Sequence, residues 1–150
     1  MRILVVSDIH ANLDAFNKVL EDAGSFDAVW CLGDITGYGP DPNECIDLVR
    51  TLPAVQCIRG NHDVANLGEI DSSLFNQEAR QSVMWQKNIL TKESKKFISD
   101  LPEKLETEKV LLAHGSPRNP IWEYLLEPYV ARMNFEYFSH HGLLKPCNLQ

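Results

Sequence analysis

Four short hydrophobic segments recur along the chain, and in each of them the apolar residues run continuously rather than alternating with polar ones. These segments are Ile3–Val6, Ala28–Leu32, Ala54–Ile58 and Val110–Ala113. Short continuous runs of this kind are typical of strands that are covered on both faces in a parallel sheet. We therefore expect four parallel strands.

Segments with apolar residues at helical spacing lie between the expected strands and after the last one. The first carries its apolar side chains between Leu13 and Ala23, and Asn12 is its candidate N-cap. The second starts at Asp41-Pro42-Asn43-Glu44, which offers an N-cap, a proline in the first turn and a capping-box glutamate. The remaining expected helices are residues 76–90, residues 92–100 with Thr91 as the cap, and residues 129–138.

This order of elements predicts a single α/β domain over residues 1–150. We expect a mainly parallel sheet flanked by helices, because crossovers between parallel strands are right-handed. Ligands of such sheets bind at the carboxyl ends of the strands. Each expected strand is followed there by polar residues: Ser7-Asp8-Ile9-His10, Gly33-Asp34, Gly60-Asn61-His62-Asp63 and His114-Gly115-Ser116.

The side chains at these strand ends suit a divalent transition metal. Asp8, Asp34 and Asn61 offer oxygen atoms, and His10 and His114 offer imidazole nitrogens. Mixed sets of this kind bind Mn²⁺, Fe²⁺, Co²⁺ or Zn²⁺. A carboxylate such as Asp34 can bridge two ions, and two ions can clamp a phosphoryl group and supply a metal-bound hydroxide for in-line attack on phosphorus.

His62 and Asp63 extend this chemistry. The His62 imidazole can protonate the leaving oxygen, and the Asp63 carboxylate can hold that ring in one tautomer. A simpler interpretation is that Asp and Asn at these positions cap helices and that the histidines lie in the core. The coincidence of such residues at four strand ends favours the metal site.

The four blocks stand in the order found in the calcineurin-like metallophosphoesterases, and residues 1–138 resemble the compact prokaryotic single-domain members of that family. The resemblance implies an α/β/β/α sandwich with two divalent ions at the sheet edge. Carried over by position, it implies five metal ligands: Asp8 and His10 on the first ion, Asn61 and His114 on the second, and Asp34 between them. It also implies that His62 protonates the leaving group with the support of Asp63.

The family pattern continues with a Gly-His-x-His block that this sequence lacks. Residues 139–150 form a divergent tail in which His140 and His141 are adjacent. Three interpretations remain open: a truncated chain, a complete protein whose site is finished by one of these histidines or by a partner chain, or a remnant used for binding or assembly. Without the block each ion loses one imidazole, and an apolar sheet face is left exposed. Such a face favours a homo-oligomer.

Composition and charge narrow the possible partners and location. Of the formal net charge of −7, residues 1–75 contribute −8 (12 acidic and 4 basic side chains), which is unfavourable for a nucleic-acid backbone. No apolar run approaches the roughly 20 residues of a membrane span, and a strand-like segment stands where a signal peptide would lie. We therefore expect a cytoplasmic protein with neither a membrane nor a nucleic acid as partner, and with unpaired buried cysteines.

Two function hypotheses follow. The first is a metal-dependent hydrolase of a phosphomonoester or phosphodiester, with Arg118 as a candidate substrate-binding residue. The second is a catalytically impaired module that binds metal or phosphate and acts through self-association. A Rossmann-type nucleotide site is disfavoured, because the loop after the first strand has no G-x-G-x-x-G and carries Asp8. An aromatic and aliphatic group can border a substrate pocket, but core packing is the more usual role of such residues: Trp122, Tyr124, Leu125 and Leu126.

Overall fold

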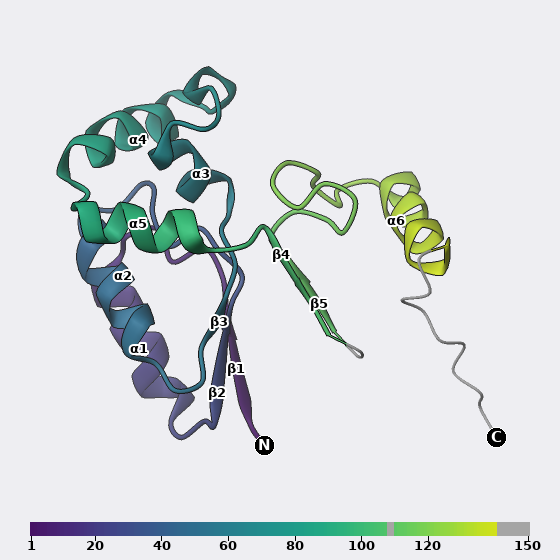
Figure 1. The fold of residues 1–150 in the computed structure, drawn as a ribbon, viewed down its shortest axis with the longest axis horizontal. Helices are drawn as coiled ribbons and strands as arrows, with labels where there is room; N and C mark the ends of the chain where they lie inside the picture. Colours follow the sequence, from purple (N-terminus) through teal and green to yellow (C-terminus); the bar gives the residue numbers. More distant parts are fainter. Residues whose placement is uncertain (108–109, 141–150) are drawn as a thin grey trace.

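The computed structural model describes residues 1–107 and 110–140, and Figure 1 shows the arrangement of its elements. The strands are β1 (Ile3–Val6), β2 (Ala28–Cys31), β3 (Gln56–Cys57), β4 (Lys104–Glu106) and β5 (Leu111–Ala113). The helices are α1 (Leu13–Ala23), α2 (Pro42–Thr51), α3 (Asn61–Leu67), the 3-10 helix η1 (Ser72–Leu74), α4 (Gln77–Ile89), α5 (Lys92–Asp100) and α6 (Pro128–His140). This order confirms the expected α/β class.

The first three strands form the expected parallel sheet, in the spatial order β1-β2-β3. Val6 lies opposite Cys31, and Cys31 lies opposite Cys57 in the next strand. Helices α1, α2 and α5 lie on one side of this sheet (Figure 1). Because the pairing is parallel, the carboxyl ends of the three strands meet at one edge.

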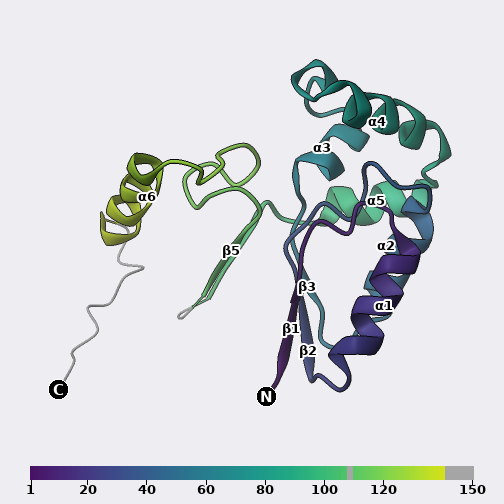
Figure 2. The same cartoon turned by 180° about the vertical axis from the view of Figure 1, so that it is seen from behind.

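The fourth expected strand lies outside this sheet, so the prediction of four parallel strands was wrong. Among the described residues, β5 pairs with β4 in an antiparallel hairpin in which Leu105 lies opposite Leu112. Figures 1 and 2 show the hairpin and α6 on the side of the sheet opposite to α1 and α2. An apolar run indicates burial but not the pairing partner. The short strand β4 was not predicted, because two of its three residues, Lys104 and Glu106, are charged and exposed.

The expected helices are present, and most begin as their caps predict. The Asn12 side chain accepts a hydrogen bond from the Ala15 N–H at 3.0 Å, and the Thr91 hydroxyl oxygen accepts one from the Ser94 N–H at 3.0 Å. At the start of α2, however, the Asp41 side chain makes no capping hydrogen bond. Helix α3 was not predicted, because its seven residues coincide with the polar strand-end motif.

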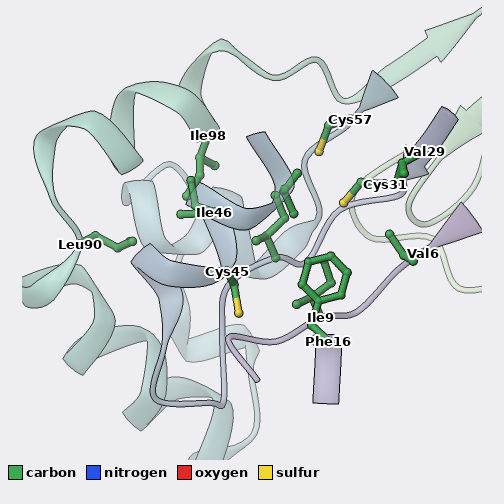
Figure 3. Close-up of a cluster of buried hydrophobic side chains, with 12 residues drawn as sticks. Val6, Ile9, Phe16, Val29, Cys31, Cys45, Ile46, Cys57, Leu90 and Ile98 are labelled. Carbon is green, nitrogen blue, oxygen red and sulfur yellow. The ribbon is translucent and has the colours of Figure 1, made fainter. Parts of the chain in front are cut away.

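The core lies between the parallel sheet and its helices. Figure 3 shows its side chains, among them Val6, Phe16 and Ile46. Cys31, Cys45 and Cys57 are buried free thiols, as expected, whereas Cys147 lies outside the described residues. Val5 alternates along β1 with the buried Val6 and is 52% exposed. In the described part of the chain no helix has the length and apolarity to cross a membrane.

Candidate metal centre

The loops that follow β1 and β2 are held against each other by main-chain hydrogen bonds. The N–H of Asp8 donates to the Gly33 carbonyl at 3.1 Å, and the N–H of His10 donates to the Asp34 carbonyl at 2.9 Å. Asp8, His10 and Asp34 all have positive φ, at 56°, 51° and 53°. Residues other than glycine rarely adopt this region, at a cost of about 1–3 kcal/mol each, and such strain concentrates at functional sites. The loops therefore hold three candidate ligands in conformations that local preference disfavours.

Asp34 lies at the centre of the site, and its side chain is only 3% exposed. Its Oδ1 accepts a hydrogen bond from the His62 main-chain N–H at 2.9 Å. Its Oδ2 lies 3.8 Å from Nε2 of His10 and 3.4 Å from Nε2 of His114. Gly60 makes this approach possible, because a Cβ at that position would collide with the Asp34 carboxylate.

The two imidazoles are oriented by main-chain carbonyls. Nδ1 of His10 lies 3.0 Å from the Thr36 carbonyl oxygen, and Nδ1 of His114 lies 2.9 Å from the Leu32 carbonyl oxygen. A carbonyl can only accept a hydrogen bond, so each Nδ1 must carry a proton. In the neutral form of each ring the lone pair is therefore on Nε2, which lies beside Asp8 and Asp34 in His10 and beside Asp34 in His114. Metal-binding histidines adopt this arrangement.

The atoms around Nε2 of His114 are arranged to bind a proton or a metal cation. Nε2 of His114 faces Oδ2 of Asp34 and lies 3.1 Å from Oδ1 of Asn61. A lone pair and two acceptor oxygens repel one another unless a proton or a cation lies between them. In the metal-free chain the proton fills this place. Burial alone lowers the pKa of His114, but the hydrogen bond and negative charge of Asp34 outweigh it and raise the pKa to about 9.

Burial and hydrogen bonding also have opposite effects on the pKa values of Asp8 and His10. A hydrogen bond from His10 outweighs burial and lowers the pKa of Asp8 to about 2. For His10, burial lowers the pKa, but hydrogen bonds to Asp8 and to the Thr36 carbonyl raise it above its usual value. Both shifts favour the charged forms of the two groups. A divalent ion could be held by the same oxygen and nitrogen atoms.

Within the described part of the chain, the His, Asp, Glu and Cys side chains that could hold a metal form two groups, in each of which the ligand atoms lie within 4.8 Å of one another. One group is His10, Asp34 and His62, and the other is Asp8, Asp34 and His114. Asp34 belongs to both, which is the property that a bridging carboxylate needs. The resemblance pairs Asp8 with His10 instead, and these side chains are also close, with Nε2 of His10 3.6 Å from Oδ1 of Asp8.

His62 is buried and surrounded by rings. Its ring centroid lies 4.8 Å from that of His10, 4.9 Å from that of Tyr38 and 4.6 Å from that of Phe75. Among the residues that the structure describes, its Nδ1 has no hydrogen-bond partner; it packs over Gly37, where a Cβ would collide with it. Burial lowers the pKa of His62 to about 4, so the ring is neutral at pH 7 in the metal-free chain.

Asp63 does not hold the His62 ring, contrary to the expectation from sequence. Its fully buried carboxylate accepts hydrogen bonds from the N–H of Gly60 at 3.1 Å, the N–H of Thr36 at 3.0 Å and the Thr36 hydroxyl at 2.8 Å. Asp63 therefore ties the loop after β2 to the start of α3. The expectation assumed that neighbours in sequence are neighbours in space, but successive residues of a helix point in different directions.

Gln86 is a residue of this site that the sequence analysis missed. From α4 it accepts a hydrogen bond from the Gly37 N–H at 2.7 Å and donates one to the Gly39 carbonyl at 2.7 Å. It is fully buried and so fixes the loop that carries Tyr38 beside His62. The helical spacing of α4 could have indicated this residue, because Gln86 lies on the same buried face as Ala79 and Val83.

Contacts among its own residues and with α6 hold the loop after β5 in place. Nη1 of Arg118 lies 3.6 Å from the Glu123 carboxylate, so this guanidinium pairs within its own loop. Glu123 also accepts hydrogen bonds from the buried side chains of Ser116 and Asn134. The hydrophobic group at positions 122–126 does not pack mainly in the core. Tyr124, Leu125 and Leu126 are 55%, 50% and 81% exposed. The His140 side chain and all of His141 lie outside what the structure describes.

The comparisons with known proteins agree with this geometry. A family model described as calcineurin-like phosphoesterase matches residues 1–144. The chain is 42% identical over 135 residues to an uncharacterised protein of Methanocaldococcus jannaschii, an alignment that covers 85% of this chain and 55% of that protein. It is 36% identical over 69 residues to the symmetrical bis(5′-nucleosyl)-tetraphosphatase of Buchnera aphidicola, over 43% of this chain and 25% of that protein.

Similarity in structure extends over most of the chain. The crystal structure of a metallophosphoesterase from Sphaerobacter thermophilus matches with a TM-score of 0.81 and 44% identity, over 92% of this chain and 56% of that one. The chain thus spans about half the length of this protein and of the archaeal relative. On the breadth of these matches and the order of its strand-end motifs, the chain belongs to the calcineurin-like phosphoesterase family.

Proposed function

We propose that the chain forms the metal centre of a divalent-metal-dependent phosphoesterase that hydrolyses a phosphomonoester or a phosphodiester. The observation that carries the proposal is the position of Asp34. Its buried carboxylate lies within 4 Å of Nε2 on two imidazoles, each of which is directed by a main-chain carbonyl. Asp8 and Asn61 supply further oxygen atoms on either side.

In this proposal Asp8 and His10 hold one ion, Asn61 and His114 hold the other, and Asp34 contacts both. When bound, two divalent ions neutralise phosphoryl oxygens and activate water as a nucleophile. The chain contributes rigidity, because the loop hydrogen bonds and the buried Asp63 fix the ligands before an ion arrives.

We assign His62 to the leaving-group side of the site. The pKa of about 4 that burial imposes leaves it without a second proton at pH 7. A bound phosphate brings negative charge beside the ring, and opposite charge within a few ångströms raises the pKa of an imidazole. His62 would therefore become a proton donor only when substrate is present. Arg118 remains a candidate for anion binding if a phosphate displaces Glu123 from it.

The test is hydrolysis of mono- and bis-p-nitrophenyl phosphate by the 150-residue chain during titration with Mn²⁺. We expect metal-dependent turnover that Asp34→Asn reduces about 100-fold or more. The matched control is Asp22→Asn at an exposed carboxylate of α1, which leaves the rate unchanged. Metal binding without turnover of either ester would instead favour the module that binds metal or phosphate. Turnover that does not depend on Asp34 would overturn the proposal.

Self-association also remains a proposal. Val5 exposes 52% of its surface on the edge strand β1, which has no further strand beside it among the described residues. Because successive side chains of a strand point to opposite faces of the sheet, Val5 lies on the face opposite to the buried Val6, and an exposed apolar face of this kind favours association with another surface.

A further inference from the structure

A row of aromatic rings leads away from the metal centre, and the proposed chemistry uses only its first member. The His62 ring contacts Phe75 at a centroid distance of 4.6 Å, and Phe75 contacts Trp122 at 5.2 Å. These two steps place the indole of Trp122 within about 10 Å of the His62 ring. This span is comparable to the distance between the 5′-phosphate and the base of a nucleotide.

The rings come from segments far apart in sequence, and hydrogen bonds hold their loops in place. Phe75 directly follows η1, whereas Trp122 lies in the loop between β5 and α6. The main-chain N–H of Trp122 donates to the Asn119 side chain at 3.1 Å. The neighbouring Glu123 side chain accepts a hydrogen bond from the Asn134 side chain of α6 at 2.8 Å. A braced loop loses little conformational freedom when a ligand binds, so the rings are already positioned.

Tyr124 joins this row to the metal ligands. Burial and the negative charge of Asp34 raise the pKa of its hydroxyl and the Asn61 side chain lowers it, so this group lies close to both residues, while 55% of Tyr124 is exposed. Its polar end therefore lies at the metal centre, and its ring faces the surrounding space. Phe75 and Trp122 are half-buried, so each of the three rings leaves part of its surface open to a ligand beside the site.

We propose that Phe75, Trp122 and Tyr124 form a shelf on which the nucleobase of a nucleotide substrate stacks while its phosphate lies at the metal centre. This inference rests on the proposed function and specifies its substrate class. The contacts are ring faces rather than hydrogen bonds to base edges, so the shelf accepts different bases with similar affinity. The cationic side chain of this loop, Arg118, is paired with Glu123, which leaves stacking as the principal attraction for the base.

The test compares two ligands that differ only in the base: the non-hydrolysable methylene phosphonate analogues of adenosine 5′-phosphate and of ribose 5-phosphate. Calorimetry with the Mn²⁺-loaded full chain should show that the adenosine compound binds about 5- to 100-fold more tightly. Trp122→Leu should bring this ratio close to one, and Trp122→Phe should restore most of it. The matched control is Trp85→Leu, at a tryptophan of α4 that is 46% exposed, which should keep the full ratio.

Equal affinity of the unchanged chain for the two compounds, or equal ratios in the Trp122→Leu and Trp85→Leu variants, would overturn the inference. If circular dichroism shows that Trp122→Leu does not fold, Phe75→Leu replaces it with the same expected loss. The binding measurement needs no turnover, so it is separate from the proposed function. Failure to hydrolyse any phosphoester would contradict that function, whereas loss of the base preference would contradict only the shelf.

Discussion

Nε2 of His114 lies 3.4 Å from Oδ2 of Asp34, although the strand that precedes His114 does not pair with the sheet that carries Asp34. The link between the two segments is made at the other ring nitrogen, where Nδ1 of His114 donates to the Leu32 carbonyl at the end of β2. The His114 side chain thus connects the end of the hairpin to the site without a strand pairing.

This relationship predicts how metal binding depends on pH. The pKa of about 9 means that His114 carries a proton at pH 7 in the metal-free chain, and a cation must displace it. We expect Mn²⁺ affinity to rise between pH 7 and pH 9 and binding at pH 7 to release close to one proton from this ring. Calorimetry in two buffers of different ionisation enthalpy measures the release. The His114→Ala variant should lack it, and an affinity that stays flat over this range would contradict the assignment.

The same pair affects the stability of the metal-free chain. A histidine whose folded pKa is raised stabilises the fold fully below its unfolded pKa, near 6.5, and loses that contribution as the pH rises through about 9. The difference in unfolding free energy between the unchanged chain and the His114→Ala variant should therefore shrink between pH 6.5 and pH 9. Urea titrations with a chelator present measure it, and a difference that grows with pH would show that the sign is wrong.

Gly60 gives a steric prediction. A Cβ at this position collides with the main chain and carboxylate of Asp34, so Gly60→Ala should displace that carboxylate. We expect a loss of about 1–3 kcal/mol in stability, together with a fall of at least about 10-fold in Mn²⁺ affinity. Gly24→Ala is the control. Its φ of 64° makes alanine cost about 1 kcal/mol, but nothing lies within 4 Å, and metal affinity should not change. Equal effects of the two variants on metal affinity would refute the prediction.

Gln86 tests whether the buried side of α4 supports the site. Gln86→Leu leaves the Gly37 N–H and the Gly39 carbonyl without their partners, which should lower the unfolding free energy by about 2 kcal/mol. Gln81→Leu, at an exposed position of the same helix, should have little effect. Denaturant titration provides both values. The loop role would be ruled out if the two variants were equally stable.

Self-association can be tested at Val5. Replacing this exposed residue of the sheet face by Lys should weaken association measured by light scattering, because a charge opposes burial of that face against another copy. Met84→Lys, at a residue of α4 that is 55% exposed, serves as the control. A strictly monomeric unchanged chain at high concentration would refute the proposal.

The parts of the fold that could be predicted from sequence are those fixed by local signals. Continuous apolar runs located β1 and β2, and Asn12 and Thr91 located the starts of two helices. Parallel pairing then brought Asp8, Asp34 and Asn61 to one edge. The pairing of β5 could not be predicted, because a three-residue apolar strand has the same sequence pattern in either arrangement.

The missed parts of the site depend on side-chain direction rather than on residue type. Asp63 was assigned to the His62 ring by adjacency, but its carboxylate turns to Thr36 and Gly60. Phe75 and Trp122 lie 47 positions apart in sequence, and their contact arises only when two loops meet over His62. Such long-range contacts leave no periodic signal in the chain.

Whether Asp34 serves two metal ions at once can be decided by counting the Mn²⁺ ions bound per chain in the unchanged protein and in Asp34→Asn, His10→Ala and His114→Ala. We expect two ions in the unchanged chain, the loss of one site in each histidine variant and weaker binding at both sites in Asp34→Asn. No bound ion in the unchanged chain, or a full complement of two in Asp34→Asn, would contradict it.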